Sequence, residues 1–433
     1  MIPISRSALL NVLTPGLARK MALGLVSFLI FFLLPAVCWE TKNTCLDCHS
    51  ALDEPLRVTT EEFSANIHAQ KGLTCASCHG GDPSSDDQAM SPKAGFRGKI
   101  DRKQIPELCG KCHADAAYMR QYNPSLRTDQ LAQYRTSVHG QKFQKGDSRV
   151  AVCTDCHGIH GIRPASDARS TVNPLKIATT CSRCHADPNY MKPYGIKTTQ
   201  FVDYSKSVHH EAMTARGDLS APTCTTCHGN HGAAPPGVAT VVNVCSTCHV
   251  YQSQLFESSP HKAAFQSAGL PGCVTCHSNH QIVHPNDEMV SQKGNSICLT
   301  CHAEGDAGFQ TAGGIHNHLL DLDSKIARSK TILDRAAESG MEVSQAQLDL
   351  IQAADSLTKA RVAVHSFRAD KVAQETASGQ VVTEKTYRAG AEALHERDKR
   401  RLGLSISLIF IGVSLAGLKL WVREIESEKP PKS

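Results

Sequence analysis

The stretch from Ser137 to Gly161 reads S-V-H-G-Q-K-F-Q-K-G-D-S-R-V-A-V-C-T-D-C-H-G-I-H-G. At its centre Cys153 and Cys156 stand three positions apart, and His157 follows the second cysteine directly. This C-x-x-C-H pattern is the signature of covalent c-type haem attachment. Two cysteines at this spacing can reach both vinyl groups of one porphyrin, and the histidine that follows is then held against the iron as an axial ligand.

The signature occurs nine times in the 433 residues and uses 18 of the 19 cysteines, so that only Cys38 is left over. The predicted attachment cysteines are Cys45, Cys48, Cys75, Cys78, Cys109, Cys112, Cys153, Cys156, Cys181, Cys184, Cys224, Cys227, Cys245, Cys248, Cys273, Cys276, Cys298 and Cys301. The predicted proximal ligands are His49, His79, His113, His157, His185, His228, His249, His277 and His302. The pattern therefore predicts nine covalently attached c-type haems.

Two other uses of paired cysteines compete with this interpretation. Structural zinc takes four ligands, and an odd number of pairs cannot combine two by two. A disulfide scaffold fits an exported protein. Neither use predicts a histidine at the same place nine times, so both are disfavoured.

The haem region contains an internal two-haem repeat, which nominates the second axial ligands. In the first motif of each repeat, one extra histidine lies upstream of C-x-x-C-H and a second usually lies shortly after it. The second motif of the repeat has neither of these extra histidines. Of the 22 histidines, 13 lie outside the signatures. Seven of these belong to the repeat, and two more come from the helical segment that follows; the nine predicted distal ligands are His68, His139, His160, His209, His231, His261, His280, His316 and His365.

Several alternatives stay open among the distal ligands. His318 competes with His316, and His365 could be an ordinary helix histidine. Met119 and Met191 are possible axial ligands, but methionine more often fills a core.

Composition predicts the fold class. Aromatic residues make up only 5% of the chain, which is a thin supply of large core side chains. Haems would fill that gap. We therefore expect a mostly irregular multihaem cytochrome c with short helices around stacked haems, followed by a C-terminal α-helical hairpin or bundle and a transmembrane helix. The formal charge of +5 does not count the two propionates of each haem, which would make the loaded protein acidic. The sequence also contains no nucleic-acid motif, so we expect no nucleic-acid partner.

The chain ends indicate export and membrane attachment. Residues 1–38 carry Arg19 and Lys20 before an apolar run, as in a signal peptide or an N-terminal anchor. Residues 402–422 are long and apolar enough for a transmembrane helix, with a buried core helix as the alternative. We expect a nonahaem domain over residues 39–312, a helical domain over 313–401 and a cytoplasmic tail over 423–433. The haem domain would lie in the periplasm, on the inner membrane.

Helical periodicity sets the pattern of residues 313–401. Gly340 is the expected stop of a first helix, and Ser344 with Gln347 predicts a capping box that opens a second. A third pattern from about Thr383 has no breaker, which predicts one continuous helix through Arg401 into the apolar stretch.

The repeated S-V-H, the C-H-G-x-H-G segments and the helical tail resemble membrane-anchored multihaem c-type cytochromes of anaerobic, metal-respiring bacteria. The resemblance implies that electrons pass from a quinol-oxidising membrane partner to periplasmic acceptors, with other cytochromes as redox partners and with the chain as part of a complex. Paired histidines on every iron would favour an electron carrier over an enzyme. The alternative is a multihaem redox enzyme of the nitrite or hydroxylamine type, with one open-coordinate haem.

Overall fold

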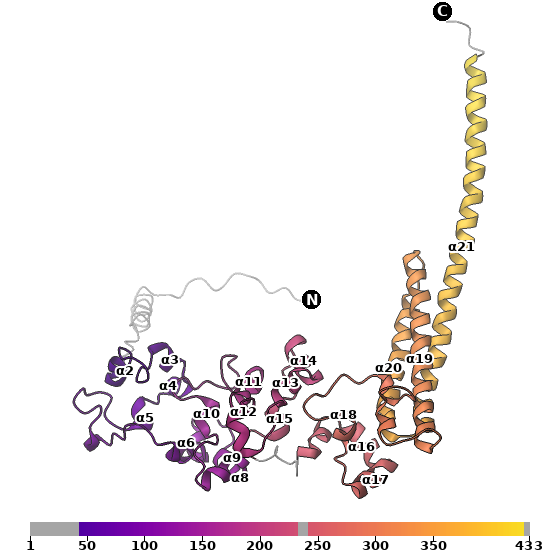
Figure 1. Cartoon of the computed structure of the whole chain (residues 1–433). Helices are drawn as coiled ribbons and strands as arrows, with labels where there is room; N and C mark the ends of the chain where they lie inside the picture. Colours follow the sequence, from indigo (N-terminus) through magenta and orange to yellow (C-terminus); the bar gives the residue numbers. More distant parts are fainter. Residues whose placement is uncertain (1–42, 233–240, 428–433) are drawn as a thin grey trace, which may run out of the picture. The chain divides into compact units, whose positions relative to one another are not determined.

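The computed structural model describes residues 43–232 and 241–427. The predicted signal or anchor over residues 1–38, with Cys38, lies outside these residues. The chain divides into two units, residues 1–101 and 102–433, and each is described by itself. The described residues form helices and turns without a strand (Figure 1), in agreement with the expected helical fold class.

The first unit holds short helices joined by loops. These are α2 (Thr44–His49), α3 (Thr60–Ala65), α4 (Ile67–Gln70), α5 (Cys75–His79) and η1 (Pro92–Ala94). The backbone amide and hydroxyl of Thr44 both donate to the carbonyl of Pro83, at 3.0 and 3.2 Å, and so tie the start of α2 to the loop after α5.

The second unit begins with a run of short helices, none longer than 12 residues. They are η2 (Arg102–Gln104), α6 (Ile105–His113), α7 (Ala116–Arg120), α8 (Gln130–Thr136), α9 (Val138–Gln144), α10 (Cys153–His157), α11 (Pro174–His185), α12 (Pro188–Met191), η3 (Lys192–Tyr194), α13 (Gln200–Ser205), α14 (Val208–Ala215), α15 (Cys224–His228), η4 (Val241–Thr247), α16 (Val250–Glu257), α17 (Pro260–Ala268), α18 (Cys273–His277), η5 (Asp287–Val290) and η6 (Ile297–Thr300). Their apolar clusters are small, such as Ala212, Met213 and Ala221, and Met119 and Met191 are buried. The protein side chains alone therefore supply little core here.

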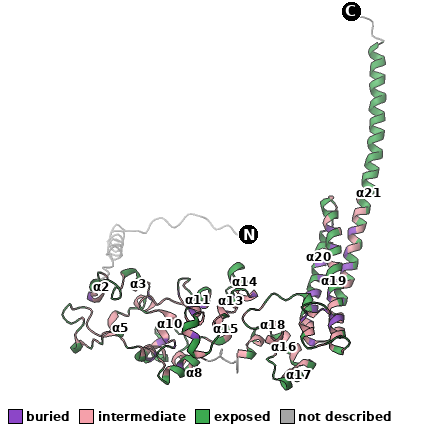
Figure 2. Cartoon of the chain, in the orientation of Figure 1, coloured by how far each residue is buried: buried purple, intermediate pink, exposed green. Residues whose placement is uncertain are grey.

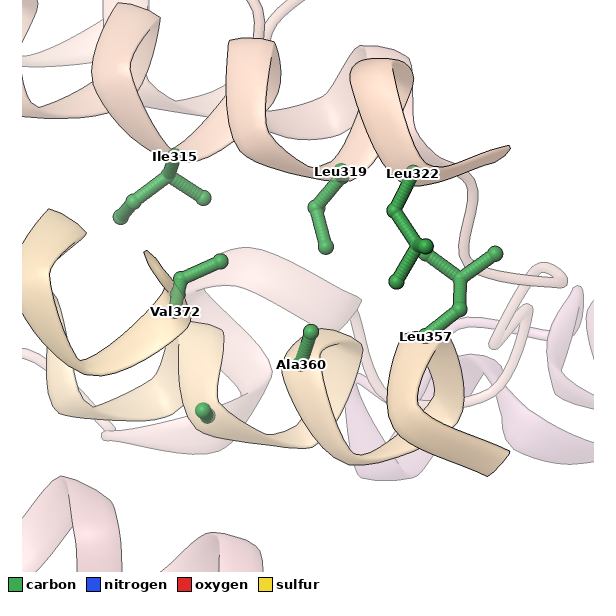
Figure 3. Packing of buried hydrophobic residues seen from close by; sticks show 7 residues of the cluster. Ile315, Leu319, Leu322, Leu357, Ala360 and Val372 are labelled. Atoms are coloured by element: carbon green, nitrogen blue, oxygen red, sulfur yellow. The ribbon is translucent and has the colours of Figure 1, made fainter. Parts of the chain in front are cut away.

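The unit ends in a bundle of three long helices, namely α19 (Ala307–Glu338), α20 (Ser344–Ala363) and α21 (Ala369–Ser427), with the turn η7 (Val364–Ser366) before the last. Its core is apolar side chains at helical spacing. Figure 3 shows Ile315, Leu319 and Leu322 of α19 facing Leu357, Ala360 and Val372. A second cluster, Leu333, Ala336, Val343, Leu350 and Ala353, continues the core along the bundle.

Small residues let α21 approach its neighbours closely. A Cβ atom at Gly379 would lie 2.9 Å from both Leu322 and Ser356, so a larger residue there would push the helices apart. The buried hydroxyl of Ser329 donates to the carbonyl of Thr383 at 2.9 Å and so satisfies a polar atom inside the bundle.

The helix boundaries confirm some predictions and correct one. Helix α19 ends before Gly340, whose positive φ of 79° is the left-handed conformation that glycine adopts easily. The predicted capping box is wrong, because Ser344 is already helical and its amide donates to the Glu342 carboxylate instead. Competition from that carboxylate moves the helix start by one residue.

Helix α21 is continuous through Arg401, as predicted, although it begins at Ala369 rather than near Thr383. It includes an apolar window with a mean hydropathy of 1.9 that is long enough to cross a membrane. Residues 398–427 are exposed throughout, as Figure 2 shows for the part beyond the bundle. An exposed apolar surface of this length makes the segment a candidate membrane span rather than a buried core helix.

We expect Leu322→Ala to destabilise the bundle, because Leu322 is 0% exposed and its removal leaves a cavity. The free energy of opening, measured by hydrogen exchange of amides in α19 and α20, should fall by about 2 to 5 kcal/mol. The matched control is Leu320→Ala, since Leu320 is 51% exposed on the same helix; its effect should stay within about 0.5 kcal/mol. Equal effects of the two variants would contradict the packing.

Candidate haem-binding sites

The attachment motifs lie on short helices or turns. In α10, Cys153 and Cys156 are one helical turn apart and therefore on the same face, and His157 is the last helical residue. Each of these motifs in α10, α15 and α18 then stops at a residue with positive φ: Gly158 at 82°, Gly229 at 79° and Ser278 at 62°. The glycine after C-x-x-C-H is thus explained by backbone geometry.

Six histidine rings of the motifs in the second unit face a second histidine ring. The pairs, with the distances between ring centres, are His139 and His185 at 6.1 Å, His157 and His231 at 6.1 Å, His209 and His249 at 6.4 Å, His228 and His280 at 6.0 Å, His261 and His302 at 5.9 Å, and His277 and His365 at 6.0 Å. Every pair joins one signature histidine to one histidine that the sequence predicts as a distal ligand.

This separation fits a metal ion between the rings. Two metal–nitrogen bonds of about 2 Å, plus about 1 Å from each nitrogen to its ring centre, give about 6 Å. Face-to-face contact would bring the ring centres closer, as the 3.8 Å between His261 and Phe367 illustrates. Edge-to-face contact can reach about 6 Å, so the distance supports a metal site only together with the pairing of signature and predicted distal histidines. With two nearby cysteines at each signature, the residues present fit an iron porphyrin held between two imidazoles.

Loss of water around the ring favours the neutral form of nine of these imidazoles. It is the main cause that lowers the pKa of nine of the paired histidines: His139, His185, His209, His228, His231, His261, His277, His280 and His365. A histidine must be deprotonated at the ligating nitrogen to bind a metal. The lowered pKa values of these nine histidines therefore favour the form that can bind a metal.

The serine of the S-V-H segments is a helix cap that sequence reasoning had not explained. Ser137 precedes α9, and its hydroxyl accepts from the amide of Gly140 at 3.0 Å. Ser207 caps α14 in the same way, accepting from the amide of His210 at 3.2 Å. The cap places the next-but-one residue, the candidate ligand, in the first turn of a helix. The S-x-H spacing was the signal that could have revealed it.

The turn η7 brings the helical bundle to two haem sites. The Nδ1–H of His365 donates to the carbonyl of Val362 at 2.9 Å, which leaves Nε2 free to act as a ligand opposite His277. Two residues later, Phe367 has a φ of 54°, and its ring lies 3.8 Å from that of His261. Residues in and directly after η7 therefore contact both candidate C-terminal haem sites, the His277–His365 pair and the His261–His302 pair.

The other candidate ligands have local hydrogen bonds that orient them. Nδ1–H of His49 donates to the carbonyl of Leu56 at 2.7 Å, and that of His79 donates to the carbonyl of Gly98 at 2.9 Å. Nδ1–H of His316 donates to the carbonyl of Asp287 at 3.1 Å. The ligand roles of His49, His68, His79, His113, His160 and His316 stay predictions, as do those of the twelve paired histidines.

Cysteines of neighbouring attachment motifs shift one another's pKa values. A hydrogen bond from the first cysteine of the preceding motif lowers the pKa of Cys153, Cys224 and Cys273; the respective partners are Cys109, Cys181 and Cys245. Burial is the main cause that raises the pKa of Cys156, Cys227 and Cys276, and cysteines of the next motif add to it; these are Cys184, Cys248, and Cys298 with Cys301. In the first unit, Cys45 donates to Cys75.

The motif of α10 has an additional support. The guanidinium of Arg102 donates to both carboxylate oxygens of Asp155, at 3.0 and 2.5 Å, and to the carbonyls of Ser148 and Val150, at 2.8 Å each. Asp155 also accepts from the amide of Val152 at 2.6 Å. These bonds fix the loop that leads into the motif.

We expect Asp155→Asn to loosen this loop, because it removes the charge from a bidentate ion pair. Hydrogen exchange over residues 148–152 should report an opening free energy lower by about 1 to 2 kcal/mol. The control is Glu107→Gln, which removes the more exposed ion pair with Arg135 and should change exchange little. A loop that exchanges equally in both variants would show that Arg102 does not support the motif.

Known proteins share parts of this sequence. Residues 67–186 match the family model Cytochrome c3, and residues 263–307 match a doubled CXXCH motif. The chain is also similar to a C-type polyheme cytochrome, OmcC, of Geobacter sulfurreducens, with 24% identity over 207 residues. That match covers 43% of this chain and 26% of the relative, so the chain spans about a quarter of the relative's length. No solved structure matches the chain.

These matches support one class for the chain, the multihaem c-type cytochromes, as the motifs predict. It binds haem c through its C-x-x-C-H motifs, and the class indicates electron transfer.

Proposed function

We propose that this protein is a membrane-tethered nonahaem electron carrier in which two histidines hold every iron. The observation that carries the proposal is the set of six ring pairs about 6 Å apart, each between a signature histidine and a repeat or bundle histidine. When bound, haem supplies a one-electron iron centre. The histidines fix its plane, and the cysteines fix its rotation about the iron axis.

The ligand arrangement supports transfer rather than catalysis. An iron with two imidazoles has no open position for a substrate, and the two nitrogen ligands keep its potential lower than a histidine–methionine pair would. The enzyme alternative needs one haem without a sixth ligand. No specific contact of the described residues favours it.

The cysteine contacts support an unbranched path. From Cys109 to Cys301, a cysteine of each motif shifts the pKa of a cysteine in an adjoining motif along the chain, which supports their proximity. Neighbouring haems would then follow the order of the sequence. We propose that electrons pass along this series between a quinol-oxidising membrane subunit and periplasmic acceptors, including other cytochromes.

The candidate span in α21 supports attachment to the inner membrane, with the haem domain in the periplasm because c-type haem is attached after export. The bundle of residues 313–401 then lies between the haems and the bilayer, and the end of the chain after residue 422 lies in the cytoplasm.

Full occupancy predicts nine haems per chain by pyridine haemochrome titration against protein mass. Electron paramagnetic resonance of the oxidised protein should show only low-spin iron, since every iron has two strong nitrogen ligands. A ratio clearly below nine would contradict the count. A high-spin signal that persists at full occupancy would support the enzyme alternative.

His365→Met tests the ligand from the bundle. Replacement of one imidazole by a thioether should raise the potential of a single haem by on the order of 100 mV and leave the other haems unchanged. The titration is followed by optical spectroscopy. His395→Met is the control, because His395 lies on α21 well beyond η7. Titration curves that are the same for wild type and His365→Met would show that this ligand assignment is wrong.

A further inference from the structure

The bundle separates the C-terminal haem sites from the candidate membrane span along the axis of one helix. The sites lie at one end of the bundle, where His365 faces His277 and Phe367 lies on His261. At the same end, the guanidinium of Arg361 in α20 donates to both carboxylate oxygens of Asp287, at 2.9 and 2.8 Å.

The opposite end of the bundle lies next to the span. There the guanidinium of Arg397 in α21 donates to the hydroxyl of Ser339, at the tip of the α19–α20 hairpin, at 3.1 Å. The apolar stretch begins at Leu402, little more than one helical turn later. Figure 1 shows α21 continuing past this tip as one unbroken helix.

Contacts between these two ends show that α21 packs alongside α19 and α20 over the whole length of the bundle. Val372 packs in the cluster of Leu322 and Leu357, and Lys385 pairs with Asp349 at 2.7 Å. A Cβ atom at Gly390 would lie 2.8 Å from Ile332. Three helices packed along this length form a stiff rod rather than a flexible tether.

The length of this rod is fixed by helix geometry. From Ala369 to Leu402, α21 rises about 50 Å at about 1.5 Å per residue. If α21 were tilted by about 40° from the membrane normal, Ala369 would still lie about 38 Å above Leu402, measured along that normal. Electron tunnelling through protein falls exponentially with distance and is ineffective over such a gap.

We propose that the bundle is a spacer, so that electrons do not pass along it between the membrane and the C-terminal haem sites, and that a partner carries them instead. This partner is a redox protein with its own metal centres outside the bilayer, which bridges the height of the bundle. The proposal rests on the proposed function, because it requires haems at the His277–His365 and His261–His302 pairs. It adds that a quinol inside the bilayer is not the direct donor to these haems.

Fluorescence lifetimes of the full-length holoprotein in lipid nanodiscs test the spacing. A dye is attached to Lys371→Cys or to Arg401→Cys, each in a Cys38→Ser background, since the other cysteines are expected to carry haem. Energy transfer to haem falls with the sixth power of distance, so the dye at position 371 should be strongly quenched, with a lifetime several-fold shorter than the dye at 401. Equal quenching would overturn the spacer.

A reduction assay tests the partner requirement. A long-chain quinol confined to the nanodisc should reduce the haems at least an order of magnitude more slowly than a soluble reductant at equal potential. Equal rates would overturn the proposal. Pyridine haemochrome titration of the same sample keeps the two proposals apart: a low haem count contradicts the proposed function, whereas full occupancy with fast reduction by the confined quinol contradicts only the spacer.

Discussion

The structure of the second unit depends on pairs of imidazole rings held about 6 Å apart. Without an iron between them, most of these rings are half-buried polar groups, and partial burial of a polar group without a partner costs free energy. With an iron, each pair becomes two metal bonds that join distant parts of the chain, such as His157 to His231. Apolar clusters among the short helices are small, and haems bound at the attachment motifs would supply the missing apolar surface.

The histidine pairs are of two kinds. His139 precedes the motif of α10 and lies opposite His185 of the second motif in the same two-haem repeat, whereas His231, after the motif of α15, lies opposite His157 of the preceding repeat. Each pair of the second kind therefore joins one repeat to the repeat before it. After the last two-haem repeat, His365 of the bundle lies opposite His277, where it would act as the ligand that a further repeat would otherwise supply. The bundle would thus supply one histidine to the last haem repeat, although its sequence contains no attachment motif.

Local chemistry made much of this predictable. The nine signatures predicted the class, helical periodicity predicted the three C-terminal helices, and the repeat nominated ligands that the structure places in pairs. What the sequence did not provide was the pairing itself, because it depends on which short helices meet in space. Ser137 and Ser207 show a second limit: their capping role follows a known rule, but the rule is recognised only once the histidine is placed in a first helical turn. The capping box at Ser344 failed because Glu342 offered the amide a nearer acceptor.

Within the second unit, the haem region and the three-helix bundle differ in the distances they set between proposed electron carriers. In the haem region, cysteines of neighbouring motifs influence one another's pKa values, so the haems proposed at these motifs would also lie near one another. In the bundle, apolar packing over several helical turns does the opposite and holds two levels apart. Electron tunnelling is fast over short distances and ineffective across a long rigid gap. The path from η7 along α21 to the apolar stretch contains no attachment motif. Electrons would therefore move among the haems of the haem region and not along the bundle.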